Sequence, residues 1–258
     1  MVIKEILHPT NPSFLVIAHR GASHEAPENT MKAFELAYKY GADMIEVDIL
    51  PSSDGVPVVI HDTFTKRLTG TEADIRNIHS SELPKLIVRL KRNRGYGSEP
   101  IPTLDELLAW AKDKILLNIE IKPEGFRPDA DSNILKKTLE LISDYSLQKS
   151  ILISSFSPAC IRQCRSLAPE VATGILYDKR AYKREDPVKV CKELGVNSLH
   201  LKKRSATRKR IHHAKENGIP VLVYTVNRKR SMKKLVQKGV KGIFSDKPAL
   251  LKETISEL

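Results

Sequence analysis

The feature that most constrains the fold is a join that recurs along the chain. A helical pattern ends in glycine, and an apolar run of strand length follows within a few residues. The join appears as KYGADMIEVDI, ELGVNSLHL, ENGIPVLVYTV and QKGVKGIFS. Its glycines, Gly41, Gly195, Gly218 and Gly239, stand where a helix end favours a left-handed residue. The chain is therefore predicted to alternate helices with strands.

Apolar runs of strand length occur eight times, at 14–18, 44–49, 115–121, 151–156, 171–177, 198–202, 221–226 and 242–245. Helical patterns separate nearly all of them, which predicts a parallel sheet. Helix starts are marked by the capping box Thr103 and Glu106 and by the pair Ser157–Pro158. Eight such units in about 250 residues is the size of a closed (β/α)8 barrel. A doubly wound open sheet is the alternative fold.

One segment interrupts the alternation. After the strand at 44–49, a turn at Asp54–Gly55 leads into a second extended run, and residues 63–100 show no clean helix. This stretch has too few apolar residues for a core of its own. We therefore expect residues 1–258 to form a single α/β TIM barrel domain, with 63–100 as a small insertion on an early βα connection.

Composition narrows the class of protein. Apolar residues make up 41% of the chain and charged residues 29%, as in an ordinary soluble globular protein, and no apolar run is long enough to span a bilayer. The N-terminal stretch lacks the features of a secretory signal. We therefore expect a cytoplasmic protein with no stable membrane anchor. Cys160 and Cys164 fall four apart in a predicted helix and are expected to be buried thiols.

The formal net charge of +12 is concentrated in the runs 202–210 and 228–234, with a further run, RLKRNR, at 89–94. Such a charge could attract nucleic acid, an anionic membrane surface or a small anionic substrate. Both late runs fall on predicted helices, where a basic face is usually only solvated. No nucleic-acid partner is therefore expected, and the oligomeric state is left open.

Acidic side chains gather on the inner face of two predicted strands. Because side chains alternate along a strand, Glu46 and Asp48 lie on one face of their strand. By the same rule, Glu120 and Lys122 lie together on one face of a second strand. Barrel enzymes keep their chemistry at the C-terminal ends of the strands. Three inward carboxylates repel one another unless a cation lies between them, and oxygen ligands favour Mg²⁺ or Ca²⁺. The alternative is that they pair with Lys122 and Arg20.

Two histidines also end apolar runs, His19 after LVIA and His61 after PVVI. Imidazole titrates near neutral pH, so a pair can share the base and acid roles of one reaction. Arg20 and Lys122 add positive charge that can contact a phosphoryl group. Carboxylates, histidines and cations together suggest hydrolysis of an anionic phosphoester.

The sequence resembles the glycerophosphodiester phosphodiesterase family. The matching stretches, in order, are HRGASHEAPENTMKAF, EVDILPSSDGVPVVIHD, IPTLDELL, NIEIK, SSF, YTVN and GVKGIFSDKP. The resemblance implies a TIM barrel that hydrolyses glycerophosphodiesters to sn-glycerol 3-phosphate and an alcohol, with one divalent cation, Mg²⁺ or Ca²⁺. The segment 63–100 falls where the family has a small insertion over the barrel mouth.

The resemblance also implies roles by position. His19 and His61 look like the acid/base pair, and Glu46, Asp48 and Glu120 look like metal ligands. Arg20 and Lys122 look like phosphate contacts. Phe156 and Tyr224, at strand ends, are candidates for packing on the glycerol or alcohol part of the substrate, or are ordinary core aromatics.

Two alternative functions remain at this point. One is a phospholipase D-like phosphodiesterase that acts on lysophospholipids, and the other is a non-catalytic basic binding protein. We also expect RLKRNR to attract anionic substrate, through Arg89, Lys91, Arg92 and Arg94.

Overall fold

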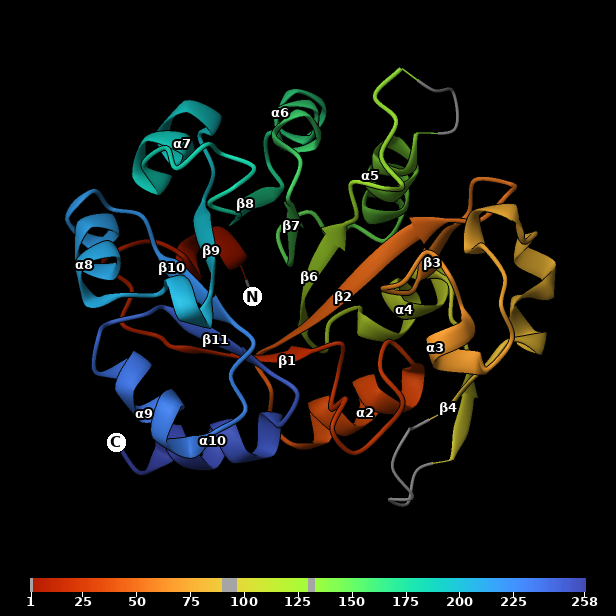
Figure 1. The fold of residues 1–258 in the computed structure, drawn as a ribbon, viewed down its shortest axis with the longest axis horizontal. Coiled ribbons are helices and arrows are strands. Elements are labelled where there is room, and N and C mark those ends of the chain that lie inside the picture. Colours follow the sequence, from red (N-terminus) through yellow and green to blue (C-terminus); the bar gives the residue numbers. More distant parts are fainter. Residues whose placement is uncertain (1, 90–96, 130–132) are drawn as a thin grey trace.

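Eight parallel strands close into a barrel in the computed structural model, which describes residues 2–89, 97–129 and 133–258 (Figure 1). The barrel strands are β1 (Leu15–His19), β2 (Met44–Pro51), β6 (Leu116–Ile121), β7 (Ile151–Ser155), β8 (Ala172–Tyr177), β9 (Ser198–Lys202), β10 (Val221–Tyr224) and β11 (Gly242–Ser245). Each predicted run forms one of these strands, and each bound lies within two residues of the prediction.

Closure of the barrel is made by β1, which pairs with β11 on one side and with β2 on the other. In the second pairing Ile17 lies opposite Met44, and His19 lies opposite Glu46. A strand paired on both sides in this way joins the two edges of the sheet. The (β/α)8 barrel is therefore confirmed, and the open doubly wound sheet is excluded.

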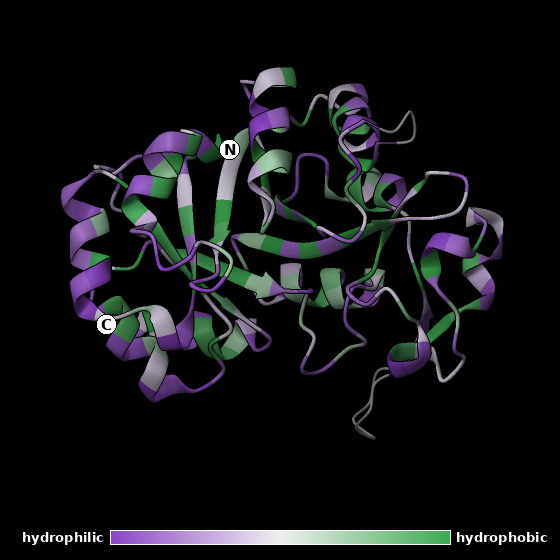
Figure 2. Cartoon of the chain, turned by 45° about the horizontal axis from the view of Figure 1, so that its top comes forward, coloured by the Kyte–Doolittle hydropathy of each residue, from purple (hydrophilic) through white to green (hydrophobic). Residues whose placement is uncertain are grey.

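Helices cover the outside of the barrel. They are α2 (Met31–Lys39), α4 (Leu104–Ala111), α5 (Ile134–Asp144), α6 (Pro158–Leu167), α7 (Pro187–Leu194), α8 (Arg208–Glu216), α9 (Lys229–Val236) and α10 (Pro248–Ser256). Their ends follow the expected signals, since Thr103 and Glu106 form the capping box of α4 and Gly195 ends α7 with a φ of 61°. Figure 2 shows apolar strands inside and polar outer faces on the surrounding helices.

Two apolar layers form the core. Outward side chains of the strands, such as Ile45 and Val47, pack beneath the helices, where the thiols of Cys160 and Cys164 are also buried. Inward side chains near the N-terminal ends of the strands form a second cluster that includes Met44. The short helix α1 (Ile3–Ile6) adds Ile3 to this cluster, with Leu7 just beyond it. Apolar side chains therefore close the N-terminal end of the barrel.

The insertion lies between β2 and α4. After β2, β3 (Pro57–Val59) runs antiparallel to it, and the insertion then contains α3 (Lys66–Thr69), the 3₁₀ turns η1 (Ile75–Asn77) and η2 (Ser80–Lys85), and the hairpin of β4 (Ile87–Arg89) and β5 (Ser98–Pro100). Four of its apolar side chains, from Leu68 to Val88, are buried against four from the flanking segments 50–60 and 101. The insertion therefore packs through a core that it shares with the barrel edge.

The basic run RLKRNR falls mostly outside the described residues. Arg89 ends β4 and is exposed, and Lys91, Arg92 and Arg94 are among the residues on which the structure gives no description. In the three described segments, no helix combines the length and the apolar character needed to cross a membrane.

Candidate active site

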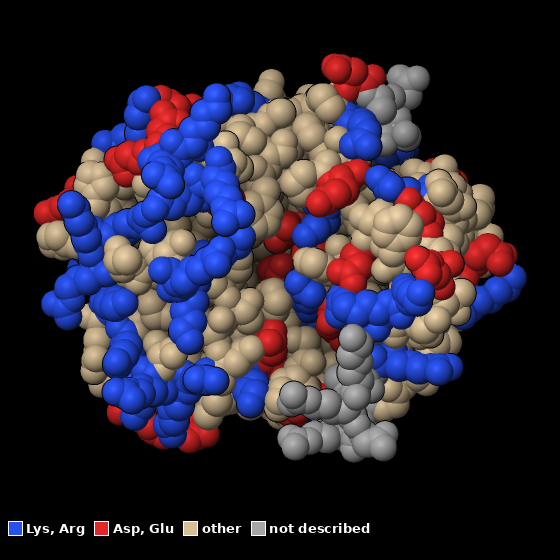
Figure 3. Space-filling view, in the orientation of Figure 1, with Lys and Arg blue, Asp and Glu red and all other residues tan. Residues whose placement is uncertain are grey.

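Three carboxylates meet inside the barrel at the C-terminal ends of its strands. Glu46 and Asp48 extend from β2 and Glu120 from β6, and Asp48 lies opposite Glu120 in the register of the two strands. The three residues are 3%, 1% and 6% exposed, and one oxygen atom from each lies within 4.8 Å of the others. Figure 3 shows Asp and Glu side chains in a hollow near the middle of the molecule. The fold thus brings together the three predicted metal ligands.

Two cations lie against these carboxylates. Arg20 Nε is 3.1 Å from Asp48 Oδ2, and Lys122 Nζ is 3.4 Å from Glu120 Oε1 and 3.8 Å from Asp48 Oδ1. The backbone N–H of Arg20 donates to Glu46 Oε2 at 3.0 Å. The alternative to a metal ion, in which the carboxylates pair with basic side chains, therefore applies mainly to Asp48, which has two cationic partners.

The protonation of the carboxylates indicates what this site can hold. Burial and the negative charge of Asp48 raise the pKa of Glu46 to about 7 and that of Glu120 to about 8. Burial also acts on Asp48, but the charges of Arg20 and its cationic neighbours outweigh it and lower the pKa of Asp48. Glu120 Oε1 is buried and accepts no hydrogen bond from the described residues. A set of crowded, under-neutralised oxygen donors fits a hard divalent cation such as Mg²⁺ or Ca²⁺.

His19 ends β1 beside these carboxylates. Its Nδ1 is 2.7 Å from Asp246 Oδ1, and its Nε2 is 3.5 Å from Thr225 Oγ1. Burial opposes protonation of His19, but the charge of Glu46 and the hydrogen bond to Asp246 outweigh burial and raise its pKa. Asp246 therefore fixes one ring nitrogen and leaves the other directed toward the site.

His61 follows β3 on the insertion side. Its Nδ1 is 2.6 Å from Asp62 Oδ1, and Lys122 Nζ donates to its Nε2 at 3.2 Å. Burial lowers the pKa of His61, and the positive charges of Arg20 and Lys122 lower it further against the opposing effect of Asp48. Both predicted catalytic histidines therefore have Nδ1 held by a carboxylate, and His61 Nε2 is linked to the acidic residues through Lys122.

A chain of ion pairs connects the insertion to this site. Arg67 of α3 pairs with Asp62, the partner of His61, and donates to both oxygens of Glu28 at 2.8 Å. Glu28 also accepts from Arg20 Nη1 at 2.8 Å. Glu28 thus joins Arg20 to the insertion, and Arg67 is a member of the site that sequence reasoning missed.

Asp246 is the other important residue that sequence reasoning missed. It directly follows β11, and Asn227 Nδ2 donates to its Oδ2 while its own backbone N–H donates to Asn227 Oδ1 at 2.9 Å. A carboxylate placed directly after a barrel strand was the available signal. Its partner could not be read from the sequence without the closure of the barrel.

The two aromatic candidates have different surroundings. Phe156 follows β7, is partly exposed, and has Lys202 Nζ 5.7 Å from its ring centre. Tyr224 ends β10 and packs edge-on against Phe244, with its hydroxyl buried and unpaired among the described residues. Tyr224 also lines a small cavity of about 20 Å³ with Glu120 and other inward residues. Phe156 therefore has a partly exposed ring, whereas the hydroxyl of Tyr224 is directed into the barrel.

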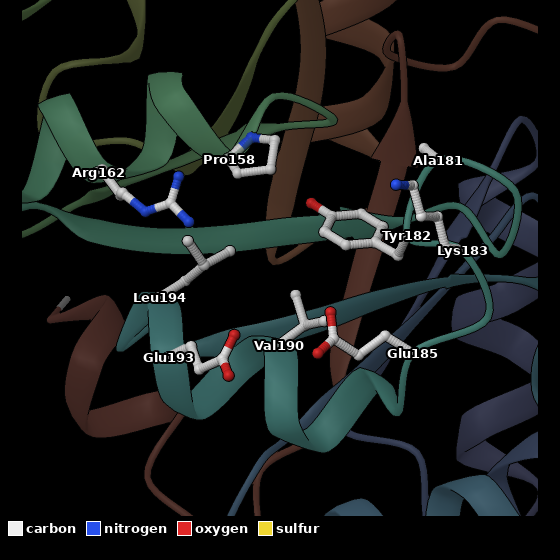
Figure 4. A pocket seen from close by; sticks show the side chains of 9 residues that line it. All are labelled: Pro158, Arg162, Ala181, Tyr182, Lys183, Glu185, Val190, Glu193 and Leu194. Atoms are coloured by element: carbon white, nitrogen blue, oxygen red, sulfur yellow. The ribbon is translucent and has the colours of Figure 1, made fainter.

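A larger cavity of about 490 Å³ lies on the flank of the barrel, between α6 and α7 (Figure 4). Its lining carries charges of both signs, with Arg162 and Lys183 facing Glu185 and Glu193. It contains none of the predicted site residues, so we place the chemistry at the carboxylates inside the barrel.

Known proteins resemble this chain over most of its length. The model of the glycerophosphoryl diester phosphodiesterase family matches residues 19–250. A glycerophosphodiester phosphodiesterase from Caldanaerobacter subterraneus subsp. tengcongensis is 35% identical over 92% of this chain and 96% of its own.

Solved structures match over most of their length as well. A phosphodiesterase from Oleispira antarctica, solved with the product sn-glycerol-3-phosphate, has a TM-score of 0.84 and 29% identity, over 95% of this chain and 97% of that one. A glycerophosphodiester phosphodiesterase from Agrobacterium tumefaciens has a TM-score of 0.78 and 26% identity, over 93% of this chain and 99% of that one. This chain therefore belongs to the glycerophosphoryl diester phosphodiesterase family and is an enzyme that hydrolyses glycerophosphodiesters.

Proposed function

We propose that the reaction depends on a divalent cation held by Glu46, Asp48 and Glu120, and that His19 and His61 move the protons. The products are sn-glycerol 3-phosphate and an alcohol. The observation that carries this proposal is a pair of histidines that each have Nδ1 on a carboxylate. His19 lines one cavity with Glu46 and Glu120, and His61 Nε2 contacts Lys122, which pairs with Glu120. A binding protein has no need of such a pair.

The chemistry divides among the residues of the site. The 2-hydroxyl of the glycerol attacks phosphorus and the alcohol leaves, and water then opens the resulting cyclic phosphate. One histidine removes the proton of the attacking hydroxyl, and the other donates a proton to the leaving oxygen. A bound cation would supply positive charge against the phosphoryl oxygens. Arg20 and Lys122 add fixed positive charge on the same side of the site.

The remaining assignments are part of this proposal. Because Phe156 is partly exposed, we assign it a contact with the substrate. The hydroxyl of Tyr224 is buried, so we assign Tyr224 a packing role inside the barrel. The single-domain organisation of residues 1–258 and the cytoplasmic location stay predictions.

A coupled assay of glycerol 3-phosphate release from several glycerophosphodiesters tests the reaction, with chelation followed by addition of Mg²⁺ or Ca²⁺. His19→Ala and His61→Ala should each lower kcat by at least about 100-fold, as expected for loss of a general acid or base. His212→Ala is the matched control, since His212 is exposed on α8.

Two results would contradict the proposal. Full activity after chelation would show that the reaction does not need the cation. An unchanged kcat in either site variant would show that the substituted histidine does not move a proton in the reaction. Faster turnover of lysophospholipids than of glycerophosphocholine would favour the phospholipase D-like alternative.

A further inference from the structure

Exposed basic residues cluster on three consecutive connections at the open end of the barrel. These connections follow β8, β9 and β10, so they lie at the same end as the buried carboxylates. We use the name basic crescent for the exposed Lys and Arg residues within 179–184, 203–209 and 228–230. Figure 3 shows Lys and Arg side chains crowding the side of the central hollow formed by α7, α8 and α9.

The positive charge of the basic crescent is not balanced locally. Its members make no ion pair with any part of the chain that the structure describes, whereas the nearby acidic residues already have partners. Asp178 Oδ2 is 3.0 Å from Lys202 Nζ, and Glu185 Oε1 is 2.8 Å from Lys189 Nζ. The crescent therefore presents a field of one sign beside the opening of the barrel.

Helix orientation adds to this field. Arg208 and Lys209 begin α8, and Arg228 and Arg230 lie at the start of α9. Neither helix has an acidic residue in its first turn. A helix N-terminus is already positive, so cations there oppose the helix dipole, and an anion is favoured at that end. This placement is unfavourable for a merely solvated basic face and favourable for an anionic partner.

The surface chemistry indicates which anion fits. Binding of single-stranded nucleic acid usually relies on aromatic platforms for the bases. The large apolar side chains exposed among the described residues are Tyr38, Phe64, Leu167 and Leu258, and none lies within the three segments that carry the basic crescent. Long cationic side chains spread around one face are instead suited to the headgroups of an anionic bilayer.

We propose that the basic crescent docks this protein on an anionic phospholipid bilayer, with the opening of the barrel facing the membrane. A phospholipid contains a phosphodiester of glycerol, and its deacylated form is a glycerophosphodiester, so the docked face and the site would meet related chemical groups, a link that rests on the proposed function. Without exposed apolar residues in the crescent, the contact is electrostatic, reversible and sensitive to salt.

Cosedimentation of the full chain with vesicles measures this docking without any turnover, so its outcome is independent of the reaction. We expect binding to phosphatidylcholine vesicles that contain about 30 mol % phosphatidylglycerol, and none to pure phosphatidylcholine. Raising NaCl from about 50 mM to about 500 mM should release the protein, because the Debye length falls below the reach of the contacts.

Charge reversal locates the contact. The variant with Lys203→Glu, Arg204→Glu, Arg228→Glu and Arg230→Glu should lose at least about 100-fold in vesicle partitioning. The matched control reverses four exposed, unpaired lysines toward the other end of the barrel, and it should retain most of the binding. The control substitutions are Lys112→Glu, Lys149→Glu, Lys215→Glu and Lys234→Glu. Thermal unfolding of both variants checks that they fold.

Orientation has its own readout. The three native cysteines are buried, so a cysteine introduced at exposed Ala181 can be labelled selectively, and Ser143, near the C-terminal end of α5, serves as the control position. Lipid-borne quencher should quench the label at 181 and not at 143. Equal loss of binding in both charge variants, quenching at 143 alone, or binding to a single-stranded oligonucleotide but to no vesicle at the same salt would each overturn the proposal.

Discussion

His19 and Asp246 are separated by 227 positions in the sequence, and their contact is the most consequential side-chain pair of the site. They meet because β1 and β11 are neighbours in the closed barrel. The carboxylate holds Nδ1 of the imidazole and contributes to its raised pKa. In this arrangement Asp246 acts through His19, as a positioning residue.

The substitution Asp246→Asn should lower the pKa of His19, because the contact that favours the charged imidazole is lost. The limb of the pH profile of kcat/KM that belongs to His19 should then move to lower pH, and kcat/KM should fall by at least about tenfold. Asp144→Asn, at the exposed end of α5, is the control. A profile that keeps its shape and position in Asp246→Asn would show that Asp246 does not act through His19.

At the scale of elements, the insertion is connected to the active site by one short helix. Arg67 of α3 links Asp62 to Glu28, and its side chain is 36% exposed. The insertion otherwise packs through apolar residues along the barrel edge. The position of His61 relative to Arg20 is therefore set in part by a polar connection at the surface.

Replacement of Arg67 by Met should leave Glu28 and Asp62 without their shared partner and loosen the position of His61. We expect kcat to fall by about tenfold with a smaller change in KM, because near-attack geometry is lost while binding contacts stay. Lys66→Met is the matched control, since Lys66 precedes Arg67 and its one ion-pair partner among the described residues is Glu72, at the surface. An equal loss in both variants would contradict a specific role for Arg67.

The elements themselves were predictable from the sequence, and the contacts between distant elements were not. Apolar periodicity and helix-ending glycines are local signals, so they gave all eight strands and the inward face of Glu46, Asp48 and Glu120. The partners of His19 and His61 depend on barrel closure and on the path of the insertion. The helix α1 carries no periodic signal in four residues, which is why it was not predicted.

At the scale of the whole molecule, the buried carboxylates link stability to pH and, under the proposed function, to the cation. In the metal-free protein the pKa values of Glu46 and Glu120, about 7 and about 8, lie above the ordinary value of 4.5. Between about pH 4.5 and about pH 8, the folded state therefore holds more protons on these two groups than the unfolded state does. Stability contributed by these groups is therefore present at low pH and is lost as pH rises toward 8.

Chelated wild-type protein should accordingly lose on the order of 3 kcal/mol of unfolding free energy from each of these two groups between pH 5 and pH 8. Glu120→Gln should reduce this loss, since the neutral amide removes one of the repelling charges. Denaturant unfolding at several pH values measures the difference between the two proteins, and Glu140→Gln on the exposed face of α5 is the control. Addition of Mg²⁺ or Ca²⁺ should restore stability to the wild type at pH 8 and not to Glu120→Gln. Parallel pH curves for both proteins would contradict the assignment of the effect to this site.

The apolar closure of the barrel by Ile3 and Leu7 also has a kinetic consequence. With one end of the barrel closed, the diester enters and both products leave through the opening at the other end. Under the proposed function, a glycerol 3-phosphate that stays in the site blocks the entry of the next substrate, so we expect the product to inhibit competitively.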